Sequence, residues 1–463
     1  WRMIEALAGV LGAVHLRQPW LGGACLAFIA VLALVLWAAW TRHLPWRRQL
    51  AAPAAGLGVA LISWGAVDLV WRPVADGVKT VVWLWVGLSV TVIVQVLLGG
   101  SAQADRDRVH QWKRRLVRVV GSGTSIAATV ATAFLAINAF FAAFPTLAAV
   151  FGMGVATTPL AALPAAAGQP RAPQRGEGPL AASWSAPGDM PAHGEVVTAE
   201  IPAGDQSGTR GFRPRDALIY LPPAYLTEQR PALPVVVALT GQPGSPSDWY
   251  ELGGLKDTMD AYAAAHDGLA PVVVVADLLG NPYRNPLCSD TVRGGRVATY
   301  LEHDVPAWIR ENLQVDTDPA HWAVAGLSNG GTCALQVVSR SPQVYPTFLA
   351  MSAEEHPSLG SEERTVRVGF DGDRAAYEAN DPISIMASAP SGRYADVAGV
   401  VSVGSDDHEY APAASVLAEA ATRAGMSISQ RDYPGRHTWA LWSVAMADQV
   451  DWLGCRLGIT PAP

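Results

Sequence analysis

A serine flanked by two glycines, in Gly326-Leu327-Ser328-Asn329-Gly330, has the spacing of an activated nucleophile. In the pattern G-x-S-x-G, the glycines allow a tight turn from a strand into a helix, and this turn holds the serine hydroxyl away from the sheet. The turn also brings the backbone N–H of Asn329 near the oxyanion that forms when the serine attacks an ester carbonyl. The pattern therefore predicts acyl transfer through Ser328, with Asn329 as one oxyanion donor.

A serine nucleophile needs a base, and one histidine near the end of the chain has the right surroundings. His437 follows a short strand predicted over Ser429–Tyr433 and precedes the last helix. In hydrolases with this nucleophile turn, the chain order is serine, acid, histidine, and the histidine lies in such a late turn. His408 is the competing base, but it follows the candidate acids too closely. We therefore predict that His437 is the base.

The acid that orients the base is expected in the acidic turn after a strand that ends at Gly404, where Asp406 and Asp407 are adjacent. Asp407 is favoured because three residues after the glycine leave the chain room to turn back toward the imidazole. Asp406 should point the other way if the chain there is still extended. The aspartate that is not the acid would cap the helix that follows.

The second oxyanion donor is expected in the loop after an early strand, which here reads Leu239-Thr240-Gly241-Gln242-Pro243-Gly244. The backbone N–H of Gln242 is the best candidate in this loop. Two other polar groups lie near the predicted site. Asp290 either borders the site or caps a loop, whereas Glu354-Glu355-His356 lacks the spaced partners that a metal site or a second acid site would need.

These side chains need a scaffold, and the chain from residue 195 onward alternates short apolar runs with helical stretches. The apolar runs are Ala217–Leu221, Val235–Leu239, Val272–Ala276, Trp322–Ala325, Thr347–Met351 and Ala398–Val403. The helical stretches are Gly254–His266, Arg296–Asn312, Thr332–Arg340, Pro412–Ala424 and Trp439–Leu457. Uninterrupted Val/Ala/Leu strands that alternate with helices predict a mostly parallel α/β sheet buried on both faces.

Four motifs in this region resemble the putative-esterase family of α/β-hydrolases, which includes esterase D-type enzymes and the mycolyltransferase antigens of actinobacteria. The motifs are Gly241-Gln242-Pro243-Gly244…Asp248-Trp249, Tyr300-Leu301…Asp304-Val305-Pro306-Ala307-Trp308, Gly326-Leu327-Ser328-Asn329-Gly330-Gly331 and Gly435-Arg436-His437-Thr438-Trp439. The resemblance covers roughly Glu195 to Leu457. It implies an ester hydrolase or an acyltransferase. The expected serine mechanism requires no metal or organic cofactor. Many relatives carry His-Gly where this chain has Thr240-Gly241.

The first third of the chain differs sharply, with four apolar stretches long enough for the roughly 20-residue helix that crosses a bilayer. They are Leu21–Trp40, Ala51–Val70, Val78–Leu98 and Ser125–Phe144. The segment Trp1–Leu16 is either a further span or a helix at the interface. We therefore expect a multi-pass cell-membrane protein with an N-terminal helical bundle and a C-terminal α/β-hydrolase domain.

Basic residues indicate how these spans are oriented. Between residues 105 and 118 the basic residues are Arg106, Arg108, Lys113, Arg114, Arg115 and Arg118. Loops rich in Lys and Arg stay in the cytoplasm, so the last span should lead outward. The catalytic domain is therefore expected outside the cytoplasm, where Cys288 and Cys333 are a candidate disulfide. The net charge of −7 argues against nucleic acid as a partner.

We expect three regions: a transmembrane domain over 1–155, a Pro/Ala-rich linker over 156–194 and an esterase domain over 195–463. The linker is predicted to be a semi-extended tether, or else a structured wrap over the catalytic domain. The predicted function is a membrane-anchored serine esterase acting on acyl or lipid esters, with aminoacylated phospholipid as one conceivable substrate.

Two other functions compete. The first is an acyltransferase of envelope lipids or sugars, and the second is a non-catalytic membrane scaffold or transporter subunit. The intact Ser/Asp/His set argues against the scaffold. The spans also hold few of the charges that transport uses, Asp68 being the acid worth noting.

Overall fold

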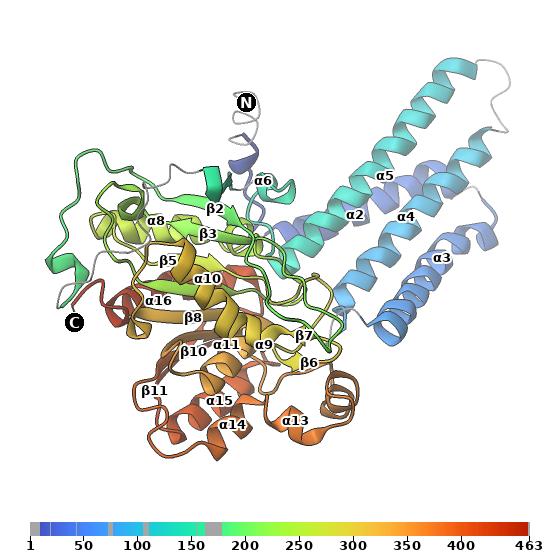
Figure 1. Cartoon of the computed structure of the whole chain (residues 1–463). Helices are drawn as coiled ribbons and strands as arrows, with labels where there is room; N and C mark the ends of the chain where they lie inside the picture. Colours follow the sequence, from blue (N-terminus) through green and yellow to red (C-terminus); the bar gives the residue numbers. More distant parts are fainter. Residues whose placement is uncertain are drawn as a thin grey trace. The chain divides into compact units, whose positions relative to one another are not determined.

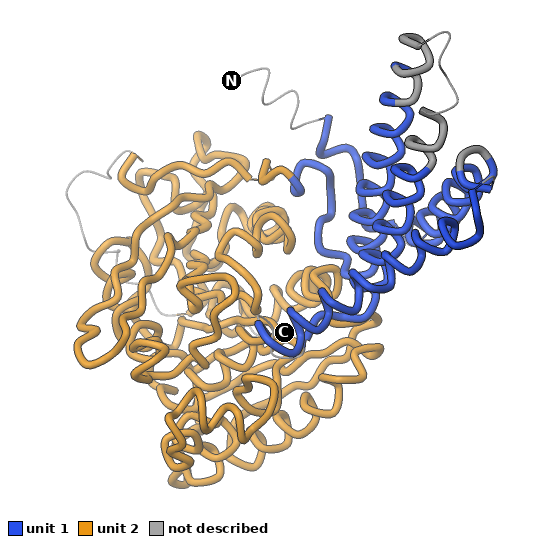
Figure 2. Tube along the Cα trace, turned by 90° about the vertical axis from the view of Figure 1, so that its right-hand side faces the viewer, with its two compact units in different colours: residues 1–150 blue, residues 151–463 orange. Residues whose placement is uncertain are grey.

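The computed structural model describes residues 10–18, 20–42, 44–72, 77–104, 111–153, 155–162 and 178–461. The chain forms two compact units, Trp1–Val150 and Phe151–Pro463, which are coloured separately in Figure 2. The observed division falls near the expected end of the transmembrane domain at residue 155. The segment expected to be a linker belongs to the second unit.

The first unit is helical. Its main elements are α2 (Leu21–Leu36), the π-helix η1 (Trp37–Thr41), α3 (Trp46–Trp64), the π-helix η2 (Gly65–Trp71), α4 (Thr80–Ala104) and α5 (Gln111–Phe141). In the part of the chain that the structure describes, three helical segments are long and apolar enough to cross a membrane: Trp46–Trp71, Thr80–Leu98 and Val119–Phe141.

The expectation of four such helices is wrong for the first stretch, where the apolar helix α2 has 16 residues and is shorter than the three segments that are long enough. Of the predicted basic segment, Arg106 and Arg108 lie outside the described residues, as do residues 1–9 of the ambiguous first segment.

Helices α3 and α4 pack closely because small residues face one another. A Cβ on Gly56 would overlap the Thr91 hydroxyl and the Gly87 carbonyl, so only glycine allows this approach. Asp68 lies at the same pair of helices. Its carboxylate accepts the Val78 N–H at 2.8 Å and the Trp83 indole N–H at 3.0 Å, so this acid ties the connection between α3 and α4 together.

The second unit is built on a nine-stranded sheet with the order β1-β2-β3-β5-β4-β8-β9-β10-β11 (Figure 1). The strands are β1 (Thr158–Pro159), β2 (Glu195–Ala199), β3 (Ala217–Leu221), β4 (Val235–Leu239), β5 (Val272–Val275), β8 (Trp322–Leu327), β9 (Thr347–Met351), β10 (Ala398–Gly404) and β11 (Ser427–Tyr433). From β5 to β11 all neighbours are parallel, and β3 is antiparallel to β2 and β5. This mostly parallel sheet confirms the predicted α/β-hydrolase fold.

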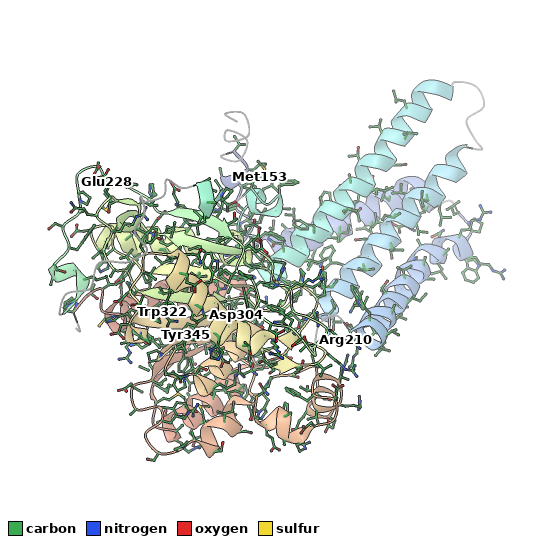
Figure 3. All side chains as sticks on the ribbon, in the orientation of Figure 1. Met153, Arg210, Glu228, Asp304, Trp322 and Tyr345 are labelled. Atoms are coloured by element: carbon green, nitrogen blue, oxygen red, sulfur yellow. A yellow bond between two sulfur atoms is a disulfide. The ribbon has the colours of Figure 1, made fainter. Side chains whose placement is uncertain are left out.

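Helices cover both faces of this sheet (Figure 1). On one face α8 (Leu255–Ala265) packs with α16 (Trp439–Arg456), and on the other α11 (Asn329–Arg340) packs with α14 (Pro382–Ser388), which contacts α15 (Ala411–Arg423). Every residue of β4, β5, β8 and β9 is buried, which explains their continuous apolar sequences. The rings of Trp322 and Tyr345, labelled in Figure 3, lie 6.3 Å apart in this core.

Two local features differ from simple expectation. The helix predicted over Arg296–Asn312 is divided into α9 (Val297–Thr299), the π-helix η6 (Tyr300–Asp304) and α10 (Val305–Asn312). A small two-stranded sheet of β6 (Asp290–Thr291) and β7 (Gly295–Arg296) precedes it.

The described parts of the Pro/Ala-rich segment pack against the catalytic unit. The N–H groups of Leu180 and Ala181 donate to the carbonyls of Gly458 and Ile459, each at 3.0 Å. The Trp184 indole N–H donates to the Asp267 carbonyl at 2.8 Å. Before residues 163–177, which lie outside the described chain, β1 pairs with β2, so the described residues on both sides of this gap contact the catalytic unit.

Candidate active site

Ser328 lies at the turn between β8 and α11, with φ at +53° and ψ at −127°. A residue other than glycine rarely adopts such a conformation, so the surrounding structure must hold it. A Cβ on Gly326 would overlap the Gly330 carbonyl, and one on Gly330 would overlap the carbonyls of Leu239 and Thr240. The two glycines therefore let the turn close against the end of β4, with Ser328 at its tip.

The structure brings Ser328, His437 and Asp407 together in one hydrogen-bonded chain. The Nε2 of His437 lies 2.9 Å from the Ser328 Oγ, and its Nδ1 lies 2.8 Å from the Asp407 Oδ2. The Asp407 side chain is 5% exposed and the His437 side chain 25%, so the base is reachable from solvent while its acid is shielded. This arrangement can take a proton from the serine and stabilise the imidazolium that results.

Asp406 does not reach the imidazole. It is exposed, and its N–H donates to the Gly435 carbonyl at 2.9 Å. The chain after Gly404 is a turn instead of an extended segment, because the Asp407 N–H returns to the Gly404 carbonyl at 3.0 Å. A Cβ on Gly404 would overlap the Gly435 carbonyl, so a glycine here lets the acid turn and the histidine turn meet.

Aromatic rings surround the imidazole on two sides, which sequence reasoning missed. The Tyr410 ring stacks on His437 with centroids 4.0 Å apart, and Trp442 meets it edge-on at 4.8 Å. The Trp442 indole N–H donates to the Ser352 hydroxyl at 3.1 Å, which fixes the ring. The available signal was the aromatic residues near both groups: Tyr410 is three residues after the acid, and Trp442 is five residues after the base.

The two candidate oxyanion donors belong to the two segments that meet at the serine, the start of α11 and the loop after β4. Asn329 is the first residue of α11, where backbone N–H groups are unpaired and favour negative charge. Gln242 lies in the loop after β4, and a Cβ on the adjacent Gly241 would lie 3.1 Å from the Ser328 Cβ. This loop therefore lies against the nucleophile. At the far end of the loop, burial raises the pKa of Asp248.

The other polar groups singled out in the sequence have structural partners. The Asp290 carboxylate accepts the N–H and the hydroxyl of Thr299, at 3.0 and 2.5 Å, and so caps the start of a helix. His356 Nδ1 lies 2.7 Å from the buried Asp381, whose hydrogen bond raises the pKa of His356. Neither residue joins the hydrogen-bonded chain of Ser328.

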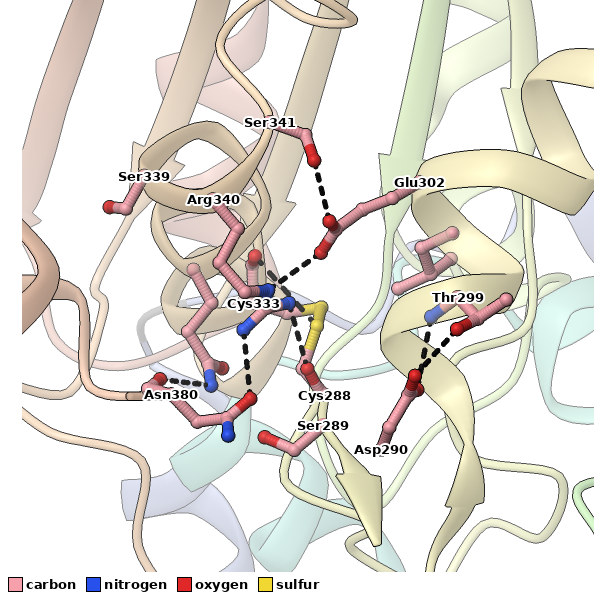
Figure 4. A network of polar contacts seen from close by, with 12 residues as sticks. Cys288, Ser289, Asp290, Thr299, Glu302, Cys333, Ser339, Arg340, Ser341 and Asn380 are labelled. Carbon is pink, nitrogen blue, oxygen red and sulfur yellow. Dashed lines mark hydrogen bonds and ion pairs between the residues drawn. A yellow bond between two sulfur atoms is a disulfide. The ribbon is translucent and has the colours of Figure 1, made fainter. Parts of the chain in front are cut away.

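Helix α11, which begins after Ser328, is linked to the loop that contains Cys288, as Figure 4 shows. Cys288 and Cys333 form a buried disulfide with Cα atoms 5.4 Å apart. Arg340 of α11 donates to the Cys288 carbonyl at 3.0 Å and pairs with Glu302 at 2.7 Å. The helix that begins beside Ser328 is thus held to the loop by the disulfide and by the Arg340 hydrogen bond, and to η6 by the Arg340–Glu302 ion pair.

Comparison with known proteins gives consistent matches. A family model described as "Putative esterase" matches residues 212–453. An uncharacterized protein of Corynebacterium glutamicum is 31% identical over 401 residues, which cover 86% of this chain and 87% of that protein. The 401 matched residues are more than the second unit, Phe151–Pro463, contains, so the match extends into the first, helical unit.

Among solved structures, a ferulic acid esterase shares 22% identity at a TM-score of 0.48, covering 57% of this chain and 98% of its own. An S-formylglutathione hydrolase from Agrobacterium tumefaciens shares 20% identity at a TM-score of 0.46, covering 58% of this chain and 98% of its own.

Proposed function

The chain belongs to the Putative esterase family, and from this premise we propose that it is a membrane-anchored serine esterase whose triad is Ser328, His437 and Asp407. The family makes it a serine hydrolase of the carboxylic-ester type. The proposal adds the residues, the membrane location and an acyl or lipid ester as substrate. The observation that carries it is the continuous hydrogen-bonded chain from Ser328 through His437 to Asp407.

The proposed reaction has two steps. His437 Nε2 takes the hydroxyl proton as Ser328 Oγ attacks the ester carbonyl. The resulting oxyanion accepts hydrogen bonds from the backbone N–H groups of Asn329 and Gln242. The imidazolium, held by Asp407, gives its proton to the departing alcohol and leaves an acyl group on Ser328. Water then attacks this acyl-enzyme while His437 takes its proton. His437 returns the proton to Ser328 Oγ as the bond between the acyl group and Oγ breaks, which releases the acid and restores the serine.

An extracytoplasmic location is supported by two independent features. Arg114, Arg115 and Arg118 lie at the start of α5, whose apolar segment Val119–Phe141 follows, so this helix should lead outward. The catalytic unit that comes next contains the Cys288–Cys333 disulfide, which is typical of oxidising compartments. An enzyme anchored in this way would remain close to lipid headgroups, which favours a lipid ester.

The experiment that tests the function uses the full chain in native membranes. We expect a fluorophosphonate to label the protein at Ser328, mapped by mass spectrometry, and a panel of lipid classes to include at least one ester that it cleaves. Transfer of the acyl group to an added sugar or alcohol faster than to water would favour an acyltransferase instead. A correctly folded protein with neither labelling nor turnover would contradict the enzymatic function.

The topology predicts which engineered cysteines an impermeant maleimide reaches. In a Cys25→Ser/Cys455→Ser background, which removes the free cysteines of the described chain, we expect Ser185→Cys to react on intact cells. Ser185 is exposed and precedes β2. The matched Gln111→Cys at the start of α5 should react only after the membrane is opened. The reverse pattern would place the catalytic unit in the cytoplasm.

A further inference from the structure

An ion pair between the partly buried Arg215 and a fully buried carboxylate lies beside the loop that carries Gln242. Asp277 lies two residues after the end of β5. It is fully buried and accepts five hydrogen bonds. Three come from Arg215, whose backbone N–H, Nε and Nη2 lie 2.8, 2.9 and 2.7 Å from the carboxylate. The remaining two come from the N–H groups of Leu279 and Gly280, both at 3.0 Å. The guanidinium is therefore held in one orientation.

The held guanidinium makes a further bond to the loop itself. Its Nη2 donates to the Gly244 carbonyl at 3.0 Å. On the next residue, the N–H and the hydroxyl of Ser245 each donate to Asp248 at 2.9 Å. The loop is thus fixed at two consecutive residues on one side of Gln242, and on the other side Gly241 lies against Ser328.

A buried ion pair contributes little net stability on average, because desolvation offsets the attraction between the charges. Its value here is geometric. An oxyanion donor is effective only when it already points to the place where charge develops, and small displacements weaken it steeply. Arg215 is the part of the ion pair that contacts the loop, and its planar fork reaches the carboxylate and the carbonyl at once.

We propose that Arg215, oriented by Asp277, is a positioning residue that holds the Gln242 N–H in the oxyanion hole. This inference rests on the proposed triad mechanism. Lysine at position 215 would keep the charge but could not bond both Asp277 oxygens and the Gly244 carbonyl. We expect Arg215→Lys to lower kcat about 10- to 100-fold with KM changed less than about threefold, since outright loss of an oxyanion donor costs roughly 10²- to 10³-fold.

The second readout is the affinity for a trifluoromethyl ketone analogue of a cleaved ester, whose adduct with Ser328 carries an oxyanion. In Arg215→Lys this affinity should fall in parallel with kcat, whereas KM reports the uncharged ground state. Arg230 provides the matched control, since it also donates to a backbone carbonyl, that of Thr227 at 3.3 Å, but lies in the β3–β4 connection at the opposite edge of the sheet. Arg230→Lys should leave kcat and the inhibitor affinity unchanged.

The outcomes separate the two proposals. If the wild-type enzyme is labelled at Ser328 and Arg215→Lys keeps its kcat and inhibitor affinity, Arg215 has no positioning role. Equal losses in Arg215→Lys and Arg230→Lys, together with equal falls in melting temperature, would mean that the effect is only structural. A wild-type protein that is not labelled at Ser328 contradicts the proposed triad itself.

Discussion

Replacing Ser328 by alanine is expected to abolish fluorophosphonate labelling and to lower kcat by about 10⁴-fold or more, as for nucleophiles in other serine triads. The substitution removes only the Oγ that His437 contacts at 2.9 Å. Alanine keeps the Cβ, so the positive φ at this position is not strained further. The catalytic unit should therefore fold normally, and the loss should lie in kcat instead of in the amount of protein.

Ser339→Ala is the matched control for this experiment. Ser339 lies on α11, the helix that Ser328 precedes, and is fully buried. Its hydroxyl donates to the Leu335 carbonyl at 2.6 Å, away from the triad. It should keep wild-type labelling and turnover. Both variants should be compared with the wild type in detergent by labelling, by steady-state kinetics and by melting temperature. Undiminished ester cleavage by Ser328→Ala would contradict Ser328 as the nucleophile.

Asp407→Asn is expected to preserve the fold yet lower kcat by about 10⁴-fold, the loss seen when the orienting acid of a serine triad becomes an amide. An amide that donates to the imidazole Nδ1 would stabilise the wrong tautomer, so His437 could no longer accept the serine proton. The buried carboxylate lies 2.8 Å from this nitrogen, which makes the effect direct. The measurement is kcat for an ester that the wild-type enzyme cleaves.

The adjacent aspartate gives an unusually close comparison. Asp406 is exposed, and its contact with the histidine turn is made by its backbone N–H, which asparagine retains. Asp406→Asn should therefore keep nearly normal kcat. A large loss in Asp406→Asn with little change in Asp407→Asn would show that the acid turn rearranges when substrate binds.

Much of the catalytic unit could be predicted because each signal was local. The bounds of β3, β4 and β9 agree with their apolar runs, since strands buried on both faces need continuous apolar residues. The nucleophile turn could be located because its glycines are dictated by backbone contacts. The sequence argument for Asp407 is that three residues after Gly404 leave the chain room to turn back, and the chain does turn there; its second assumption, an extended chain at Asp406, does not hold.

What could not be predicted depends on contacts between distant segments. Tyr410 and Trp442 contact the imidazole only after β10 and β11 pair and bring two turns together. The Arg215–Asp277 pair joins residues 62 positions apart, and no local spacing marks it. In the membrane unit, hydropathy located the first apolar stretch but did not show that its α-helix is shorter than the three candidate spans.

The wrap of residues 180–184 also determines how the catalytic unit carries mechanical load. Leu180 and Ala181 are bonded beside the last helix, at Gly458 and Ile459, and Trp184 is bonded to the carbonyl after α8. A pull transmitted along the chain from the membrane helices first meets the pairing of β1 with β2 at the edge of the sheet, and then these three bonds. The tension is therefore met first by the outermost strand and by the wrap, and four strands separate that edge strand from β8, at whose end Ser328 lies.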